Sequence, residues 1–539
     1  MSCNFRRPSL LFSITTIIIL LILLPTLALF KGIFQPVTES WIHIKTYLLN
    51  QYIMNSLILV ISVGIITGII GTYLSWSLTQ YKFKGNSLLT TLLFIPMAIP
   101  PYIAGYIYNG IFNYTGTLER IFRALSLQPI RIDILSTGGV IFVFSLFLMP
   151  YVILATISFF YKLPDSYFES SILLGKTPRQ TFFKVILPMS RGAIIGGIVL
   201  VVLEVLNDYG LVKYFGVPTF STAIYSTWFG LGDIQSAIRL ASNLMIIVFI
   251  ILVTEQLLRG KGRISQPRAL VKSSLKKEPS KIYKIVFYCI YSFYMILSVI
   301  IPIAQLIYWS ILASNNIILK GLSKLIFNTL FLAVIVTISV LICGLIIGNY
   351  SRLSKSFLRK IYSRVVILGY SVPASIIAVA VMIFFLSIDR GLTRIYEFLD
   401  FKNLFLTSSI IILIFAMIIR FMAIGFNNIE SGFNKMGIKY YEASKLLGKS
   451  DWVTFFKVDL PILKPAIISA VILIFVDVLK ELPLTLILRP FNFDTLATKV
   501  YTYAGDEMIH EASVYALVIV LVSVIALTTL QFLQKEKVK

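Results

Sequence analysis

Four carboxylates stand within long apolar runs of this sequence, where an ionised group is costly. Glu204 and Asp208 lie four residues apart in one run, and Asp477 and Glu481 lie four residues apart in another. If each run is one helix, each pair shares a helix face. Carboxylates at such positions usually face a cavity or an ionic partner, and several oxygen ligands together favour a hard cation. The pattern predicts four groups along the path of a cation.

The same carboxylates allow a purely structural interpretation. Lys480 stands beside one pair and could neutralise it, while Asn207 stands beside the other pair and could form a hydrogen bond with it. Buried charges are normally paired and hydrogen-bonded. Pairing or gating therefore remains an alternative to direct contact with a cation, and no residue is assigned as a certain metal ligand.

A second pattern points at first sight to phosphate chemistry. GKT at 175–177 and GKS at 448–450 match the end of the phosphate loop G-x-x-x-x-G-K-[ST]. That motif needs a glycine five residues before its second one, where this chain has Ser170 and Ala443. No strand pattern precedes either stretch, and Pro178 follows the first. We expect neither a nucleotide-binding site nor a catalytic residue in this chain.

Composition indicates which elements hold these residues. The chain has 539 residues, a mean hydropathy of +0.88, 58% hydrophobic residues and only 13% charged residues. No soluble domain has this composition, and a spanning helix needs about 20 apolar residues. We predict an all-α polytopic membrane protein with about 12 transmembrane helices. The predicted spans cover residues 10–31, 55–79, 88–112, 137–160, 191–212, 237–258, 284–312, 326–348, 363–388, 406–424, 464–487 and 513–533.

The basic residues indicate the orientation of the chain. The net charge is +24, and most lysines and arginines fall in polar segments on one side of the predicted topology. Such a bias marks the cytoplasmic side, so both termini of this multi-pass protein are expected in the cytoplasm. Basic residues distributed in this way argue against nucleic-acid binding, and contact with membrane lipid is expected instead. The two histidines and three cysteines form no metal or disulfide pattern.

The chain is internally duplicated. ESSILLGKTPRQTFFKVILP at 169–188 returns as EASKLLGKSDWVTFFKVDLP at 442–461, at an offset of 273 residues. At the same offset, Phe220 matches Phe493. About six spans per half return the chain to its starting side, so the halves are parallel repeats about an axis along the membrane normal. The predicted organisation is a first half at 1–258, a basic cytoplasmic linker at 259–283 and a second half at 284–539.

Each repeated stretch belongs to a polar loop, at 162–190 in the first half and 435–463 in the second. A short helix is predicted in each loop, ended by Gly175 or Gly448, because glycine adopts a left-handed backbone at the least cost. A second short segment follows and is closed by a proline, which the first turn of the next helix tolerates. The two loops predict paired knobs that serve a two-fold symmetric partner.

These loops resemble the EAA loop, E-A-A-x-x-x-G followed by L-P, of permease subunits in type I bacterial ABC importers. The matching residues are Glu169, Ser170, Ser171, Gly175 and Pro188 in the first loop and Glu442, Ala443, Ser444, Gly448 and Pro461 in the second. The resemblance implies the all-α permease fold of that class and a place in the bacterial inner membrane. It also implies coupling to two copies of a cytoplasmic ABC ATPase, which binds ATP and Mg²⁺, so no cofactor is expected in this chain.

Two longer segments resemble fused ferric-iron permeases that are served by a periplasmic binding protein. Residues 207–233 contain YFGV-x-TF, and residues 480–507 contain ELP-x-TL-x-LRPF-x-F-x-TLAT. The resemblance implies translocation of Fe(III), delivered by an extracytoplasmic binding protein, through alternating access. Fused permeases for thiamine and other small solutes share this layout, so those substrates remain alternatives. An ion-coupled secondary transporter, with the four carboxylates as proton sites, is the alternative from another class.

The predicted outer loops carry aromatic and basic side chains that are expected to contact the binding protein. They are Tyr214, Phe215, Trp228, Arg489, Phe491 and Phe493. An interfacial aromatic belt is the alternative, since Trp and Tyr favour the membrane surface. Prolines at 96, 100, 101 and 373 interrupt the third and ninth spans. They predict either helix breaks near the pathway or kinks satisfied by neighbouring helices.

Overall fold

The computed structural model describes residues 9–33, 36–128, 132–259, 278–313, 321–354, 356–398 and 404–535. Most of the predicted linker, residues 260–277, lies outside these ranges. Among the described residues, eleven helices are long and apolar enough to cross a membrane, or twelve if one bent helix pair counts as a span. The all-α polytopic class predicted from the sequence is confirmed.

The first half alternates long helices with short ones. In chain order they are α1 (Ser9–Ile33), α2 (Glu39–His43), α3 (Leu49–Gln80), α4 (Asn86–Leu92), α5 (Pro101–Phe112), α6 (Thr117–Ala124), α7 (Thr137–Lys162), α8 (Ser166–Leu173), α9 (Pro178–Thr181), α10 (Leu187–Asn207), α11 (Gly210–Tyr214), α12 (Phe220–Tyr225) and α13 (Ile234–Arg259).

The second half follows the same plan. Its helices are α14 (Lys281–Met295), α15 (Ile301–Ala313), α16 (Leu322–Leu353), α17 (Phe357–Ser371), α18 (Ala374–Phe398), α19 (Ile410–Met436), α20 (Lys439–Leu446), α21 (Asp451–Thr454), α22 (Leu460–Leu479), α23 (Pro483–Leu488), α24 (Leu496–Gly505) and α25 (Ile509–Lys535). Short π-helical or 3₁₀ segments connect some of these helices: η1 (Ile44–Leu48), η2 (Ile95–Ala98), η3 (Phe182–Ile186), η4 (Ser226–Gly230), η5 (Ile296–Ile300) and η6 (Phe455–Asp459).

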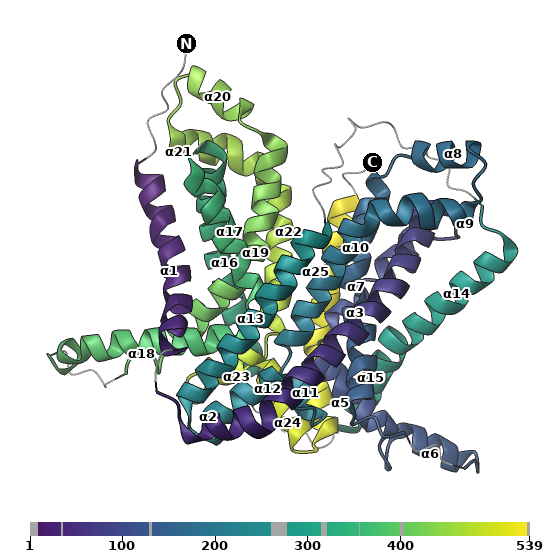
Figure 1. Ribbon diagram of the computed structural model, residues 1–539, viewed down its shortest axis with the longest axis horizontal. Coiled ribbons are helices and arrows are strands. Elements are labelled where there is room, and N and C mark those ends of the chain that lie inside the picture. Colours follow the sequence, from purple (N-terminus) through teal and green to yellow (C-terminus); the bar gives the residue numbers. More distant parts are fainter. Residues whose placement is uncertain are drawn as a thin grey trace.

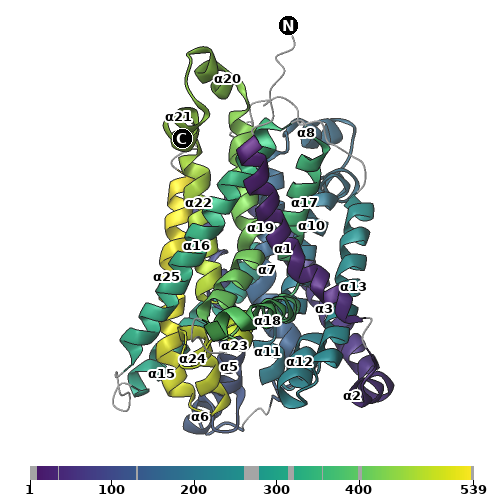
Figure 2. The same cartoon turned by 90° about the vertical axis from the view of Figure 1, so that its left-hand side faces the viewer.

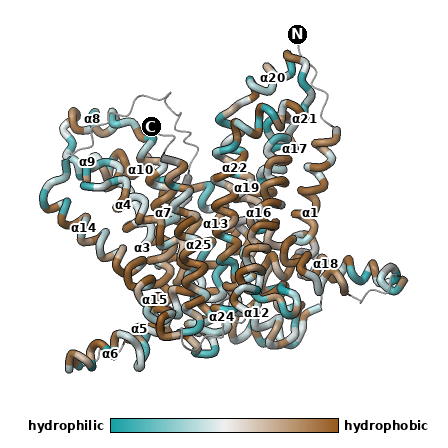
Figure 3. The backbone as a smooth tube through the Cα atoms, turned by 180° about the vertical axis from the view of Figure 1, so that it is seen from behind, coloured by the Kyte–Doolittle hydropathy of each residue, from teal (hydrophilic) through white to brown (hydrophobic). Residues whose placement is uncertain are grey.

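Helix boundaries repeat with the sequence. α3 and α16 each have 32 residues and begin 273 residues apart, and the short pairs α8/α20 and α9/α21 keep the same offset at both ends. α8 and α20 lie at the same end of the bundle, where α1 also begins and α25 ends (Figure 1). Hydrophobic residues cover the long helices between this end and the other (Figure 3). The two halves are therefore parallel in the structure.

The third and ninth predicted spans are each broken into two helical parts. The third breaks between η2 and α5, and the axes on either side differ by 87°. The ninth breaks at Val372–Pro373 between α17 and α18. In Figure 1, α18 then lies roughly at right angles to the long helices and extends outward from the bundle, and Figure 2 shows it nearly end-on. Proline lacks an amide hydrogen and excludes the helical conformation from the residue before it. Of the two interpretations of these prolines, the helix break is correct.

The fifth and eleventh spans also end earlier than predicted. α10 ends at Asn207 and α22 at Leu479, and short helices α11 and α23 follow after a break. Asp208 has an extended backbone with ψ of 133° and so lies just outside the helix that carries Glu204. The prediction that the two carboxylates share one continuous helix face is therefore wrong, and Asp477 and Glu481 are separated in the same way.

The first helices of each half pack on the other half. α1 contacts α16, α17 and α18, and the hydroxyls of Thr16 and Tyr362 lie 2.8 Å apart. α14 contacts α3 and α15 contacts α5, and the hydroxyls of Tyr283 and Ser77 are also 2.8 Å apart. These outer helices thus bury part of their apolar surface against the opposite repeat, which ties the halves together.

The sequence repeat changes register near its end. Thr219 caps α12 and Thr495 caps α24, each in a reciprocal hydrogen-bonded capping box, at an offset of 276. The side-chain amide of Asn55 donates to the carbonyl just before the first cap at 2.9 Å, and its repeat mate does the same before the second at 3.0 Å. The second half therefore has three more residues before the cap of α24 than the first half has before the cap of α12. The predicted match of Phe220 with Phe493 is wrong, because the caps define the true equivalence.

Glycine permits the close contact between α7 and α10. A Cβ atom on Gly197 would lie 2.9 Å from the Cα atom of Val152, and a backbone atom cannot rotate away. We expect Gly197→Ala to lower the free energy of unfolding by about 1–3 kcal/mol through overpacking. Thermal unfolding of the purified chain in detergent measures this effect. Gly391→Ala is the control, because nothing lies within 4 Å of its added Cβ. Equal melting of the two variants would contradict the packing argument.

Candidate functional site

Two matching knobs project from one end of the bundle. α8 and α9 form the first knob and α20 and α21 form the second, with Gly175 at φ +79° and Gly448 at φ +73° between the helices of each pair (Figure 1). No atom lies within 4 Å of a Cβ built on either glycine. The left-handed backbone alone therefore requires glycine at these positions.

The hydroxyl of each GK[ST] stretch has a local structural role. The Thr177 hydroxyl accepts a hydrogen bond from the backbone amide of Gln180 at 3.2 Å, and the Gln180 side chain accepts one from the Thr177 amide at 3.1 Å. Ser450 caps α21 by accepting from the amide of Val453 at 3.3 Å. A capping box satisfies amides at a helix start. The spacing T-x-x-Q was visible in the sequence and accounts for the resemblance to a phosphate loop.

The third position of each EAA motif closes its knob internally. The hydroxyls of Ser171 and Thr181 lie 2.9 Å apart, and those of Ser444 and Thr454 lie 2.8 Å apart, with all four side chains buried. This hydrogen bond joins α8 to α9 and α20 to α21. A small residue is needed at this position because the two short helices pack directly over it.

The tips of the knobs are apolar, a feature that the residue assignments from sequence missed. Two adjacent leucines precede the glycine in each knob and are 76–89% exposed; they are Leu173, Leu174, Leu446 and Leu447. The sequence signal was the repeated LLGK within a polar loop. Exposed apolar residues of this kind mark a contact surface. Glu169 and Glu442 lie in the first turns of α8 and α20, where the helix dipole favours a carboxylate.

The proline that follows each knob lies in the first turn of α10 or α22, as predicted, but the helical backbone does not restart there. Helical backbone runs from 178 to 207 through Pro188 and from 451 to 479 through Pro461. The π-helical segment η3 precedes the first proline and η6 precedes the second. Wider π-helical turns accommodate a proline ring and its missing amide hydrogen, so the knob is joined rigidly to the spanning helix.

A buried ion pair anchors the base of the second knob. The guanidinium of Arg352, at the end of α16, donates to both oxygens of Asp459 at 2.9 and 2.5 Å. The side chains are 5% and 1% exposed, and the guanidinium also lies 4.6 Å from the ring centre of Phe433. Tyr441 covers this pair and donates to Asp451 at 2.7 Å. Burial, and then this hydrogen bond, raise the pKa of Tyr441, so the phenol stays protonated.

The first knob has an aromatic base at the same place. At the offset of 273, Trp76 corresponds to Asn349, which lies three residues before Arg352 in the second half. Ile186 corresponds to Asp459, so the first half lacks the acidic partner of the ion pair. The Trp76 ring lies 5.3 Å from that of Phe160 and 5.2 Å from that of Phe182. The repeats therefore hold equivalent knobs by different chemistry.

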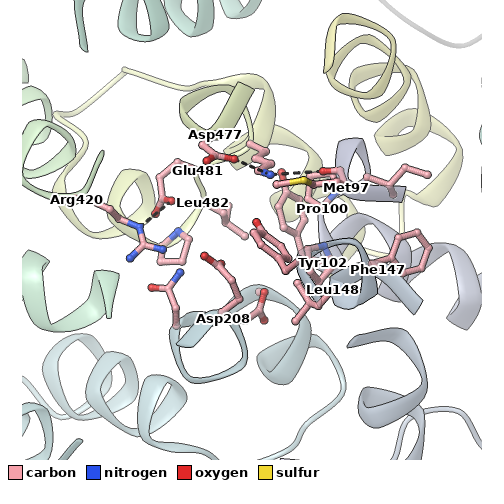
Figure 4. A pocket seen from close by; sticks show the side chains of 18 of the residues that line it. Met97, Pro100, Tyr102, Phe147, Leu148, Asp208, Arg420, Asp477, Glu481 and Leu482 are labelled. Atoms are coloured by element: carbon pink, nitrogen blue, oxygen red, sulfur yellow. Dashed lines mark hydrogen bonds and ion pairs between the residues drawn. The ribbon is translucent and has the colours of Figure 1, made fainter. Parts of the chain in front are cut away.

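All four predicted carboxylates line one cavity of about 80 Å³ in the middle of the bundle. The breaks after α10 and α22 bring Glu204, Asp208, Asp477 and Glu481 to it, and the break before α5 brings Tyr102. Figure 4 shows the side chains of Tyr102, Asp208 and Glu481 converging from three of these elements. Among the described residues, no three carboxylates are close enough to share one metal ion.

Two of the carboxylates have basic partners from their own half. The ammonium of Lys480 lies 2.8 Å from Asp477, and the guanidinium of Arg420 lies 3.5 Å from Glu481. Asp208 instead accepts a hydrogen bond from the amide of Leu211 at 2.8 Å. The structure therefore brings together the cavity expected for a cation path and the pairing expected for a structural role.

Beside this cavity, two residues at equivalent positions of the repeat each form a hydrogen bond to the other half. The side-chain oxygen of Asn207 accepts from the amide of Ala374, the first residue of α18, at 2.6 Å. Lys480, its mate at an offset of 273, donates to the carbonyl of Met97 in η2 at 3.5 Å. Each half thus contacts the broken helix of the other half at the same level of the bundle.

The six residues predicted to contact a binding protein have different environments. Phe215 is 4% exposed and does not reach the surface, whereas Phe491 is 94% exposed. Tyr214 accepts a hydrogen bond from Asn109 at 2.9 Å. Arg489 pairs with an acidic neighbour in its own loop, and Trp228 and Phe493 are partly buried against the core. Of the six, Phe491 extends furthest into solvent.

Comparison with known proteins finds one family model twice. The model described as "Binding-protein-dependent transport system inner membrane component" matches residues 61–256 and again residues 340–538. The chain is 24% identical over 531 residues to the Fe(3+)-transport system permease protein FbpB 2 of Haemophilus influenzae, covering 94% of this chain and 96% of the relative. The predicted resemblance to fused ferric-iron permeases is confirmed.

Other relatives differ in their substrates. The ferric transport system permease protein FbpB of Actinobacillus pleuropneumoniae is 24% identical over 492 residues, which cover 86% of this chain and 69% of the relative. The sulfate transport system permease protein CysT of Salmonella typhimurium is 28% identical over 200 residues, which cover 36% of this chain and 69% of the relative. Both knobs and the four cavity carboxylates lie within the two ranges that the family model matches.

The buried pair at the second knob allows a stability test. Arg352→Met leaves the Asp459 carboxylate buried without its guanidinium, so we expect a loss of about 3–5 kcal/mol in the free energy of unfolding. The double variant Arg352→Met/Asp459→Leu should recover most of that loss, because apolar replacements of a buried pair are often neutral and the first half already has an apolar base here. Thermal unfolding in detergent measures both. A double variant as unstable as the single one would contradict this account.

Proposed function

We propose that this chain, which belongs to the family of binding-protein-dependent transport system inner membrane components, forms the membrane pathway of an ATP-driven importer of ferric iron, Fe(III). The family membership rests on a model that matches both halves. The importer would combine this permease with two copies of a cytoplasmic ABC ATPase and with an extracytoplasmic binding protein. ATP and Mg²⁺ would bind to the ATPase, and this chain would carry out no catalysis.

The observation that carries the choice of cargo is the acidic lining of the central cavity. Four carboxyl groups line it against two basic groups, Arg420 and Lys480. An anion such as sulfate would meet an excess of acidic groups in a partly desolvated site, where like charges repel most strongly. A multivalent hard cation gains from the same lining. The cavity therefore supports a cationic cargo. The relative that aligns over 94% of this chain is named as an Fe(3+)-transport permease, which supports Fe(III) as that cation.

The observation that carries the coupling is the pair of matched knobs. Two equivalent apolar tips at one end of a pseudo-two-fold bundle fit a dimeric partner that moves both together. The positive-inside bias supports a cytoplasmic position for that end and for both chain termini. Each knob continues into a spanning helix that reaches the cavity, α10 from the first and α22 from the second. Closure of the ATPase dimer would therefore move the cavity walls directly.

Alternating access would follow from the contacts between the halves. Asn207 and Lys480 join each half to the broken helix of the other. Drawing the knobs together would rotate the halves about their shared axis, part these contacts and open the cavity toward the binding protein. Hydrolysis would then restore the contacts and the inward-facing form.

The cargo is tested by uptake in the source bacterium. Deletion of this chain should abolish ATP-dependent uptake of radioactive ferric iron and leave uptake of sulfate and thiamine unchanged, and a plasmid copy should restore it. Loss of thiamine or sulfate uptake instead would replace the cargo. Uptake that survives deletion of the ATPase but stops with a proton uncoupler would favour an ion-coupled secondary transporter.

The coupling surface is tested at the exposed leucines. Two buried leucines contribute about 3 kcal/mol to a contact, so Leu446→Asp/Leu447→Asp should reduce capture of the ATPase by more than about tenfold. The variant at Leu173 and Leu174 should behave alike. Copurification of the ATPase with the tagged permease measures this, at equal amounts of permease in the membrane. Leu231→Asp is the control. This leucine is 63% exposed and lies just before the first residue of α13, at the end of the bundle away from the knobs. Undiminished capture by both knob variants would refute the assignment.

A further inference from the structure

The ammonium group of Lys480 occupies the acidic cavity in this structure. It lies 2.8 Å from Asp477, with side chains 16% and 14% exposed, and 3.5 Å from the carbonyl of Met97 in the other half. An ammonium is a compact cation on a flexible four-carbon stem. A positive charge is therefore already bound where the proposed cargo would find its carboxylate ligands.

This cation belongs to one half of the repeat only. The mate of Lys480 is Asn207, and the mate of Arg420 is Phe147. The described lining contributed by the first half includes Glu204 and Asp208 but no basic residue. Simple duplication of a structural ion pair does not explain this asymmetry, because the carboxylates are present in both halves and the ammonium in one.

A neutral oxygen group completes the cavity without a partner of its own. Tyr102 is 6% exposed, lines the cavity and points into it (Figure 4). Its hydroxyl makes no hydrogen bond to the described residues. A buried hydroxyl without a partner costs free energy unless a ligand or water satisfies it. Phenol and carboxylate oxygens are hard donors of the kind that suit hard cations.

We propose that Lys480 is a tethered substitute for the transported cation, held on Asp477 until a multivalent cation enters and displaces it. This inference rests on the proposed import of a cation through the same cavity. A multivalent ion binds a carboxylate more strongly than a single ammonium does, so the exchange is directional. The displaced ammonium can remain near the Met97 carbonyl or withdraw from it, and withdrawal removes one contact between the halves.

The substitute would also prevent the cavity from trapping its cargo. Four carboxyl groups without a competing cation would hold a multivalent ion tightly, and conduction requires that an ion leave as well as enter. Return of the ammonium to Asp477 releases the ion toward the cytoplasm. The separation of the carboxylates, in which no three of the described ones share a coordination site, fits a site that assembles only when the ammonium leaves.

Retention of cation by the intact complex tests this role. The permease assembled with its ATPase in nanodiscs, without ATP or binding protein, is mixed with radioactive ferric citrate and passed through a desalting column. The wild type should retain little iron. Lys480→Met, and Lys480→Gln in case the first variant folds poorly, should retain about tenfold more, equivalent to about 1.4 kcal/mol. Lys480→Arg should retain as little as the wild type, and Lys480→Met/Asp477→Asn should return to the low level.

Controls separate this role from a structural one. Lys499→Met removes a lysine of α24 that does not line the cavity, and it should leave retention unchanged. Equal retention by the wild type and both single neutral variants would overturn the inference, as would raised retention that persists in the double variant. Uptake by the wild-type importer is measured separately. Absence of ferric uptake there would refute the proposed function, whereas normal uptake with unchanged retention in the Lys480 variants would refute the substitute role alone.

Discussion

Backbone groups that are freed within an apolar bundle must find partners inside the protein, and this constraint determines where the cavity lies. Helices break before α5 and α18, where proline removes an amide hydrogen, and after α10 and α22. Polar side chains meet the exposed backbone there: Asp208 accepts from the amide of Leu211, and Glu481 accepts from that of Leu484 at 3.2 Å. Irregular backbone at membrane depth is tolerated only where protein or a water-filled cavity surrounds it. The carboxylates therefore cap broken helices and line a polar cavity at the same time.

The two halves share an architecture but differ in side-chain chemistry at the bases of the knobs and in the lining of the cavity. Ser171 and Ser444 close the two knobs identically. Below them, the ion pair of Arg352 corresponds to an aromatic cluster around Trp76 in the other half. A bidentate ion pair is directional, whereas an apolar cluster is not. Under the proposed coupling, equal displacements of the two knobs would consequently meet a stiffer connection at the second knob than at the first.

The sequence predicted the repeat, the parallel halves and the knobs, because each leaves a local signal. Glycine at a helix end and a duplicated polar loop can be read directly. Hydropathy could not reveal that α10 ends at Asn207, because the apolar run continues beyond the break. The three-residue shift before α24 was also hidden, since chance matches such as Phe220 with Phe493 persisted at the old offset. The partners of Lys480 and Arg420 depend on packing between distant helices, which spacing along one chain does not specify.

Fusion of the halves into one polypeptide has a consequence for the charge of the pathway. The second half contributes two acidic and two basic groups to the cavity, whereas the first contributes two acidic groups and no basic one. Two identical copies of the second half would give a balanced lining, and two identical copies of the first would give four acidic groups with no counterion. A symmetric homodimer can adopt only such doubled sets. A fused chain can hold an intermediate surplus of two acidic groups. Under the proposed function, this surplus would favour a cation, and the resident ammonium would limit how tightly that cation is held.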